Sequence, residues 1–162
     1  MTFLVVVMGV SGSGKSTLGA DLALVLGVPF VDADDLHPVE NITTMSAGNP
    51  LTDDDRWPWI RTVGLTLAAA EPAGLVVACS ALRRAYREAI LAEAPTTRFV
   101  MLDVPEEQIA ERMRARDGHF MPATLLASQL ATLEPLEADE PGITVGPELS
   151  AAQVARLVVA EY

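Results

Sequence analysis

The segment from Gly9 to Ser16 constrains the fold more than any other part of the chain. Its sequence, Gly-Val-Ser-Gly-Ser-Gly-Lys-Ser, fits the phosphate-loop pattern G-x-x-x-x-G-K-[ST]. An apolar, β-branched run from Phe3 to Met8 precedes it, and leucines at helical spacing, Leu18 and Leu22, follow it. That order of strand, glycine-rich turn and helix is the setting in which the pattern binds phosphate groups. We therefore expect an α/β protein with a parallel sheet built around a P-loop.

Each residue type in this segment has a physical reason to contact a nucleotide. Glycines allow successive backbone N–H groups to converge on phosphate oxygens, and the start of the following helix adds a positive dipole end. Lys15 is the only lysine among eleven Lys and Arg residues, and its compact ammonium can reach the outer phosphates of ATP. The Ser16 hydroxyl is the expected Mg²⁺ ligand. The predicted ATP-binding residues of the loop are Gly9, Val10, Ser11, Gly12, Ser13, Gly14, Lys15, Ser16 and Thr17.

The rest of the chain continues the alternation of strands and helices. Short apolar runs at residues 29–32, 75–79, 98–102 and 142–145 are typical of strands, and apolar stripes at helical spacing fill the intervals. Such a repeat predicts one parallel sheet with helices on both faces and ligands at the carboxyl ends of its strands. We expect a single domain over residues 1–162, because a chain of this length does not hold a second domain of ordinary size.

The charge of the chain narrows its partners. Eleven basic and 22 acidic residues give a net charge of −11, so the field of the protein repels nucleic-acid phosphates and anionic lipid heads. No apolar run approaches the roughly 20 residues that a membrane span needs. The single cysteine, Cys79, lies in an apolar segment and cannot form an internal disulfide, which predicts a reducing compartment. We expect a cytoplasmic protein with a small-molecule partner and neither a nucleic-acid nor a membrane partner.

A phosphate loop identifies the nucleotide and not the acceptor. A GTPase needs an Asn-Lys-x-Asp element for guanine, and the only lysine of this chain lies in the phosphate loop. Motor and transport ATPases need partner domains to convert hydrolysis into movement. A small kinase is the class that this chain length favours.

Two carboxylates follow the predicted second strand. Side chains alternate along an extended segment, so Asp32 and Asp34 should face the same crevice. Phosphoryl transfer to a hydroxyl needs one carboxylate to accept the proton, predicted to be Asp34, and a second to orient Mg²⁺ through water, predicted to be Asp32. A solvated acidic turn is the alternative interpretation of this pair. Asp103, at the end of another predicted strand, is a competing carboxylate, although a role in capping the next turn explains it equally well.

Arg56 is the predicted anchor for an anionic acceptor. It lies between three aspartates, Asp53 to Asp55, and both tryptophans of the chain. A guanidinium fixed among acids and rings can form a bidentate pair with a carboxylate. A structural ion pair with the aspartates is the alternative. Arg83 and Arg84, which follow another predicted strand end, are the next candidates for binding substrate.

Positive charge is concentrated between residues 83 and 116, which hold seven arginines and six acidic residues. A glycine-containing loop follows this arginine-rich stretch. The combination predicts a lid over about residues 117–135, which would close over ATP and exclude water. Arg112 is expected to contact the nucleotide, and Arg116 the transferring phosphoryl group. A solvated Arg/Glu helix face is the alternative for these arginines. His119 has no metal-ligating partner at useful spacing, so a zinc site is not expected.

Several further motifs occur together with the phosphate loop. They are Asp-x-Asp-x-Leu-His-Pro at 32–38, Asp-x-Asp-Arg-x-Pro-Trp at 53–59, Cys-Ser-Ala-Leu at 79–82 and Gly-His-Phe at 118–120. In this combination, over about residues 8–140, the chain resembles the small gluconokinases of the thermoresistant type. The resemblance implies a P-loop fold like that of nucleoside-monophosphate kinases and shikimate kinases, with five strands in the order 2-3-1-4-5 and a lid.

The same resemblance implies an activity. It is the ATP-dependent phosphorylation of D-gluconate to 6-phosphogluconate by a homodimer, with His37, Ser80 and His119 among the substrate-binding residues. Two other functions stay open at this point. One is another small-molecule kinase of the same fold, such as a shikimate kinase, and the other is a non-catalytic nucleotide-binding switch.

Overall fold

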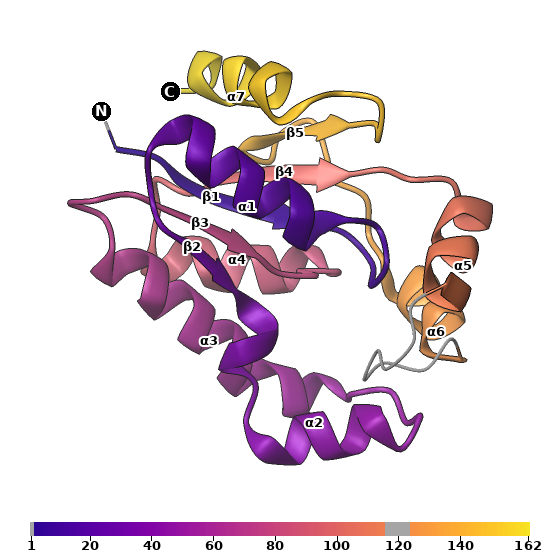
Figure 1. The fold of residues 1–162 in the computed structure, drawn as a ribbon. Coiled ribbons are helices and arrows are strands. Elements are labelled where there is room, and N and C mark those ends of the chain that lie inside the picture. The colour runs from indigo at the N-terminus through magenta and orange to yellow at the C-terminus, as the bar shows by residue number, and fades with distance from the viewer. Residues whose placement is uncertain (1, 116–123) are drawn as a thin grey trace.

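A computed structural model describes residues 2–115 and 124–162. Its five strands form one parallel sheet in the order β2-β3-β1-β4-β5, which confirms the expected order (Figure 1). The strands are β1 (Leu4–Met8), β2 (Phe30–Asp32), β3 (Leu75–Ala78), β4 (Arg98–Leu102) and β5 (Gly142–Val145). Each strand that the sequence predicts is present, and the apolar runs therefore mark this sheet correctly.

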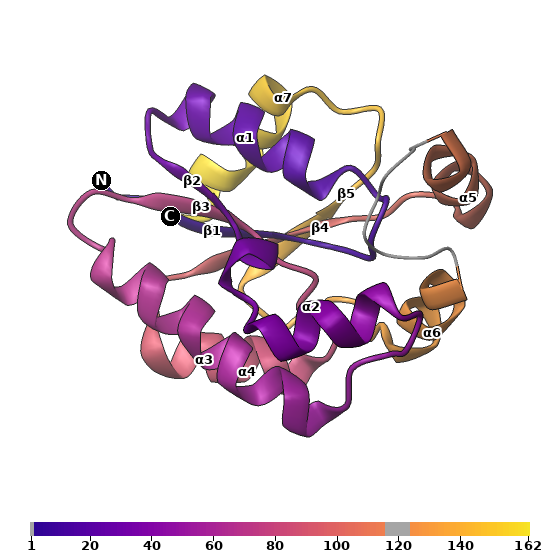
Figure 2. The same cartoon turned by 60° about the horizontal axis from the view of Figure 1, so that its bottom comes forward.

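Helices cover both faces of the sheet. They are α1 (Lys15–Leu26), the 3-10 turn η1 (Ala33–Leu36), α2 (Val39–Ser46), α3 (Asp53–Ala69), α4 (Arg84–Glu93), α5 (Glu106–Ala115), α6 (Thr124–Thr132) and α7 (Ala151–Ala160). Figure 2 shows α1 and α7 on one face and α3 and α4 on the other, while α2, α5 and α6 lie towards the carboxyl ends of the strands. None of the helices in the described part of the chain is long and apolar enough to cross a membrane.

Strand β1 forms the middle of the sheet and contributes to two cores. Its five side chains are all buried, and they alternate between the two faces. Val6 and Met8 pack with residues of α3 and α4, whereas Val5 and Val7 pack with residues of α1 and α7. Burial of each such side chain contributes about 1.5–3 kcal/mol, so this strand fixes the sheet and the position of the loop that follows it.

The expected apolar stripes of the helices are confirmed in part. The sequence predicts one stripe that includes Leu22 and Val25 and another that includes Val154 and Leu157. Leu22 in α1 and Val154 in α7 are buried as expected, but Val25 and Leu157 are 52% and 44% exposed. Helix α3 begins with a capping box, in which Thr52 accepts a hydrogen bond from the backbone N–H of Asp55 and the Asp55 carboxylate accepts one from the backbone of Thr52. The acidic first turn of α3 thus helps to cap this helix.

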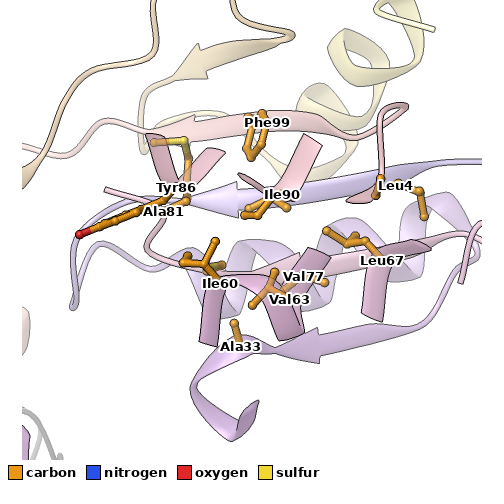
Figure 3. Packing of buried hydrophobic residues seen from close by; sticks show 14 of the residues in the cluster. Leu4, Ala33, Ile60, Val63, Leu67, Val77, Ala81, Tyr86, Ile90 and Phe99 are labelled. Carbon is orange, nitrogen blue, oxygen red and sulfur yellow. The ribbon is translucent and has the colours of Figure 1, made fainter. Parts of the chain in front are cut away.

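Helix α4 is fastened to the segment after α6 by a buried ion pair. The guanidinium of Arg87 is fully buried and donates to both carboxylate oxygens of Glu140, at 2.6 and 2.8 Å. It also donates to the backbone carbonyls of Ala81 and Glu134. Figure 3 shows the neighbouring Tyr86 ring in the core beside Ala81, with its hydroxyl directed away from the cluster. Because these partners lie in the turn after β3 and in the segment between α6 and β5, Arg87 joins α4 to both of these segments.

Candidate active site

The phosphate loop connects the carboxyl end of β1 to the first turn of α1. Gly12 and Gly14 have φ angles of 81° and 95°, in the left-handed region that favours glycine. A Cβ on Gly12 would come within 2.9 Å of the Met113 side chain, so α5 packs directly on the loop. A small polar cavity follows this curve, and it is lined by Ser11, Gly12, Gly14, Lys15, Ser16, Thr17 and Asp34. The sequence-predicted loop residues therefore form a cradle at the N-terminus of α1.

Ser16, which lines this cradle, contacts Asp32 at the end of β2. The Ser16 hydroxyl donates to Oδ2 of Asp32 at 2.7 Å, although the two residues belong to α1 and β2. Both groups are hard oxygen donors of the kind that Mg²⁺ prefers. The structure thus brings together the two residues that the sequence assigns to the metal.

Asp34 also lies beside the cradle, but for a different reason than alternation along a strand. Strand β2 ends at Asp32, and Asp34 already belongs to η1. Oδ1 of Asp32 accepts the backbone N–H of Asp34 at 2.9 Å, so Asp32 caps the 3-10 turn. This cap turns the chain at the strand end and leaves the Asp34 side chain in the lining of the phosphate cradle.

A second cavity adjoins the cradle on the side of α2 and α3. It is partly open to solvent and shares Ser11, Lys15 and Asp34 with the cradle. Its other lining residues are His37, Met45, Pro50, Leu51, Arg56, Trp59, Ser80, Leu82, Ser128 and Gln129. Lys15, Asp34, His37, Arg56 and Ser80, which the sequence assigns to catalysis or to substrate, all line this one cavity. We call it the acceptor cavity.

Arg56 is held rigidly in the wall of the acceptor cavity. It is only 9% exposed, and its Nη1 donates to the Tyr86 hydroxyl at 3.2 Å. Tyr86 in turn donates to the Asp53 carboxylate, and its ring lies 5.7 Å from the Arg56 guanidinium. Burial raises the pKa of the Tyr86 phenol, which keeps that group neutral and able to donate. Arg56 is therefore linked to Asp53, in the first turn of α3, through the Tyr86 hydroxyl. The alternative interpretation of Arg56 was an ion pair with these aspartates.

His37 lies in the same wall, stacked on Trp59. The two rings are 3.9 Å apart with an interplanar angle of 16°. Burial, and then the positive charge of Arg56, lower the pKa of His37 from 6.5 to about 4, so the imidazole is neutral near pH 7. A neutral imidazole carries one N–H donor and one acceptor nitrogen.

The end of β3 supplies Ser80 to the acceptor cavity. Cys79 before it is buried, as the sequence suggests, and burial raises the pKa of the thiol to about 12. Ala81 after it has a φ of 42°, which is uncommon for a residue with a side chain. The carbonyl of Ala81 accepts a hydrogen bond from Nη1 of Arg87 at 3.0 Å, and this bond holds the turn that directs Ser80 inward.

Arg83 and Arg84 do not reach the acceptor cavity. The Arg84 guanidinium contacts Glu88, Glu137 and Asp139, with two parallel bonds to Asp139 at 2.9 and 2.8 Å. Arg83 is half exposed, and its Nε lies 3.8 Å from the Asp53 carboxylate. Both predicted substrate-binding arginines therefore have acidic partners at the surface, where the chain has many carboxylates because its acidic residues outnumber its basic ones.

Arg112 lies on the side of the phosphate loop away from the acceptor cavity. Its Nη1 donates to the Ser13 carbonyl at 2.8 Å, and its expected contact with the nucleotide stays a prediction. It also lines a groove of about 550 Å³, formed with Thr17, Leu18 and Asp21 from α1, and with Pro147, Leu149, Ser150 and Ala151 from the segment before α7. The sequence gives no signal for these last four residues, because they match no motif.

The lid is described only in its second half. Arg116 and His119 lie outside the described residues, and their expected roles stay predictions. Helix α6, within the expected lid, contacts the phosphate loop, because the Ser11 N–H donates to Oε1 of Gln129 at 2.7 Å. Sequence reasoning assigned no role to Gln129.

Asp103, the competing carboxylate, is exposed and lines none of these three cavities.

A parallel sheet in this order, with a phosphate loop at the end of its central strand and an acceptor cavity beside it, defines a P-loop kinase. The family described as AAA domain matches residues 4–136. A gluconokinase of Gluconobacter oxydans (strain 621H) is 48% identical over 145 residues, which are 88% of this chain and 82% of the relative.

The thermosensitive gluconokinase of Escherichia coli (strain K12) is 44% identical over 141 residues, 85% of this chain and 75% of the relative. The crystal structure of a gluconokinase from Sinorhizobium meliloti 1021 superposes with a TM-score of 0.85 at 48% identity, covering 98% of this chain and 90% of that one. The chain belongs to the gluconokinase family, and the resemblance that its motifs suggest is confirmed.

Proposed function

We propose that this protein is an ATP:D-gluconate 6-phosphotransferase. The observation that carries the proposal is the position of Asp34, which lines both the phosphate cradle and the acceptor cavity. A carboxylate at this junction lies where the phosphoryl donor and the accepting hydroxyl must meet. The gluconokinase relatives support gluconate as the acceptor.

The cradle and the groove beside it suit ATP. The triphosphate would follow residues 9–17, with Lys15 at the outer phosphates, and the adenosine would occupy the groove between α1 and residues 147–151. Arg112 would add positive charge on this side.

Mg²⁺ would enter with the nucleotide. No group of three or more His, Cys, Asp or Glu residues in the described chain could hold a metal ion by itself. Mg²⁺ commonly takes one or two protein oxygens together with phosphate oxygens and water. Ser16 and Asp32 fit that requirement, and the ion bound there would neutralise charge on the phosphates.

The acceptor cavity would bind gluconate through groups at its two ends. Arg56 would pair with the carboxylate, because it is the fixed guanidinium in the lining of this cavity. Asp34 would accept the proton of the 6-hydroxyl as its oxygen bonds to the γ-phosphorus and the bond to the leaving ADP oxygen breaks. Lys15 would balance the charge that develops on the phosphates.

A direct assay tests this function. The purified protein is incubated with ATP, Mg²⁺ and either gluconate or shikimate, and ADP and the phosphorylated product are measured. We expect turnover with gluconate at least a hundredfold above turnover with shikimate. Turnover with shikimate alone would assign another kinase of the fold, and intact ATP with every acceptor would indicate a nucleotide-binding switch.

The proposal includes a homodimer, which the resemblance implies, and a cytoplasmic location, which the net charge and the single cysteine of the chain predict. Light scattering at several protein concentrations measures the mass in solution, and a particle of about one chain mass, 17.2 kDa, would exclude the dimer. Fractionation of cells tests the location, and recovery of the protein outside the cytoplasmic fraction would exclude it.

A further inference from the structure

His37 is the acceptor-cavity residue whose orientation is most completely determined. Its side chain is 3% exposed, its ring is stacked on Trp59, and the Trp59 indole N–H donates to the Ala33 carbonyl at 2.7 Å. The stack fixes the plane of the imidazole. What remains to be determined is which ring nitrogen carries the proton.

The contacts of Asn41, which lies in α2 four residues after His37, determine which nitrogen is protonated. Its side chain is buried, and its Nδ2 lies 3.0 Å from the Asp55 carbonyl and 3.2 Å from Nδ1 of His37. A backbone carbonyl can only accept, so the amide atom facing Asp55 must be the nitrogen. The same nitrogen therefore donates to His37, and Nδ1 must be the acceptor.

The proton of the neutral ring is then on Nε2, the nitrogen nearer Asp34. Nε2 lies 4.0 Å from Oδ1 of Asp34, too far for a direct hydrogen bond. Two atoms at that separation can both lie about 2.8 Å from one oxygen placed between them, which is an ordinary hydrogen-bond distance. Among the described residues, the charged groups around the ring are Arg56, Asp32 and Asp34, and burial together with the Arg56 cation keeps the imidazole neutral.

We propose that Asn41 is a positioning residue that holds His37 as the Nε2–H tautomer, and that this N–H donates to the oxygen of the acceptor hydroxyl beside Asp34. The hydroxyl would accept from His37 and donate to Asp34 at once, which orients its proton towards the base. A group that cannot both accept and donate would not satisfy the pair. This inference rests on the proposed function, because it takes Asp34 as the base.

The tautomer can be observed without activity. The chain has two histidines, so ¹⁵N-histidine labelling gives a simple NMR spectrum, and His37→Phe assigns the signals. We expect His37 of the unmodified protein to be protonated on Nε2 alone at pH 7. In Asn41→Asp, a carboxylate faces Nδ1 and we expect that nitrogen to become protonated. Asn49→Asp, the same change at an exposed asparagine, should leave the tautomer unchanged.

Kinetics of two His37 variants test the donor role. His37→Gln can place an amide N–H near the position of Nε2, whereas His37→Phe keeps the stack on Trp59 and loses the donor. We expect His37→Phe to lower kcat/KM for gluconate by about tenfold or more, with KM for ATP within about twofold, and His37→Gln to recover part of that loss.

Three results would overturn the inference. They are a proton on Nδ1 in the unmodified protein, an unchanged tautomer in a folded Asn41→Asp variant, and equal losses in His37→Gln and His37→Phe. If the unmodified protein does not phosphorylate gluconate, the proposed function fails, while the NMR measurement still decides the tautomer.

Discussion

Asp32 accepts the Ser16 hydroxyl on one carboxylate oxygen at 2.7 Å and uses its other oxygen to cap η1. One side chain thus connects the metal-side hydroxyl of α1 to the turn that carries Asp34. A substitution that replaces one carboxylate oxygen of Asp32 therefore distinguishes its contact with Ser16 from its role in capping η1.

Asp32→Asn should weaken the response to Mg²⁺ while keeping the fold. Asparagine is as good a cap as aspartate, but it lacks the charge that faces the ion. We expect the Mg²⁺ concentration for half-maximal activity to rise about tenfold, measured by titration at fixed ATP. Asp35→Asn, an exposed change in the same turn, is the control. Equal Mg²⁺ curves for both variants would remove Asp32 from the metal site.

Lys15→Arg should lose most turnover although it keeps the charge. Lys15 is 8% exposed at the first turn of α1, and a planar guanidinium is too broad for this tight loop. We expect kcat to fall by about a hundredfold or more, with little change in melting temperature. A kcat close to that of the unmodified protein would contradict the assignment.

Asp34→Asn and Asp103→Asn distinguish the two candidate bases. We expect Asp34→Asn to reduce kcat by about a hundredfold or more while ATP still binds, since general-base effects have this size. Asp103→Asn should leave kcat within about twofold, because Asp103 is exposed and lines none of the described cavities. The reverse pattern would place the chemistry at the end of β4.

Arg56→Lys should raise KM for gluconate by about tenfold or more and leave KM for ATP unchanged. A lysine keeps the charge but cannot form the bidentate pair. Arg84→Lys is the matched control, and because its acidic partners lie outside the cavity it should affect neither constant. A lower melting temperature with an unchanged gluconate KM would make Arg56 a purely structural partner of Tyr86.

The buried His37 should make stability depend on pH in a defined window. Its pKa is about 4 in the folded protein and 6.5 in the unfolded chain, so the folded state binds fewer protons between these values. The free energy of unfolding should therefore fall as pH drops from 6.5 to 4. The decrease for this group is up to about 3 kcal/mol and should be absent in His37→Phe. Urea unfolding at several pH values measures it, and parallel curves for the two proteins would contradict it.

The fold and the cradle could be predicted because their signals are local. A β-branched run, a glycine pattern and one lysine lie within 16 consecutive residues, and they specify strand, turn and helix together. The alternation rule used for Asp32 and Asp34 does not apply to this pair, because alternation holds within a strand and β2 ends at Asp32. Asp34 lines the cradle from η1, whereas Asp32 contacts Ser16 and lines none of the three cavities.

Long-range contacts limited the rest of the prediction. Arg84 has the same chemistry as Arg56, and only the folded chain shows that it faces Glu137 and Asp139 instead of the cavity. Gln129 reaches the phosphate loop from 118 positions away, a contact that no spacing rule contains. The nucleotide-side groove is lined by Pro147 and Leu149, whose residue types are common in any loop.

Lys15 is the only lysine of the chain, so lysine-directed proteolysis has a single site, and this site is buried. An endoprotease specific for lysine can hydrolyse only the peptide bond between Lys15 and Ser16, which lies in the first turn of α1. A protease must bind its substrate in an extended form, so that turn has to unfold before the bond is cut. The rate of this one cleavage therefore reports how often the phosphate loop opens. A nucleotide that occupies the cradle slows the cleavage by a factor of one plus the ratio of the nucleotide concentration to its Kd.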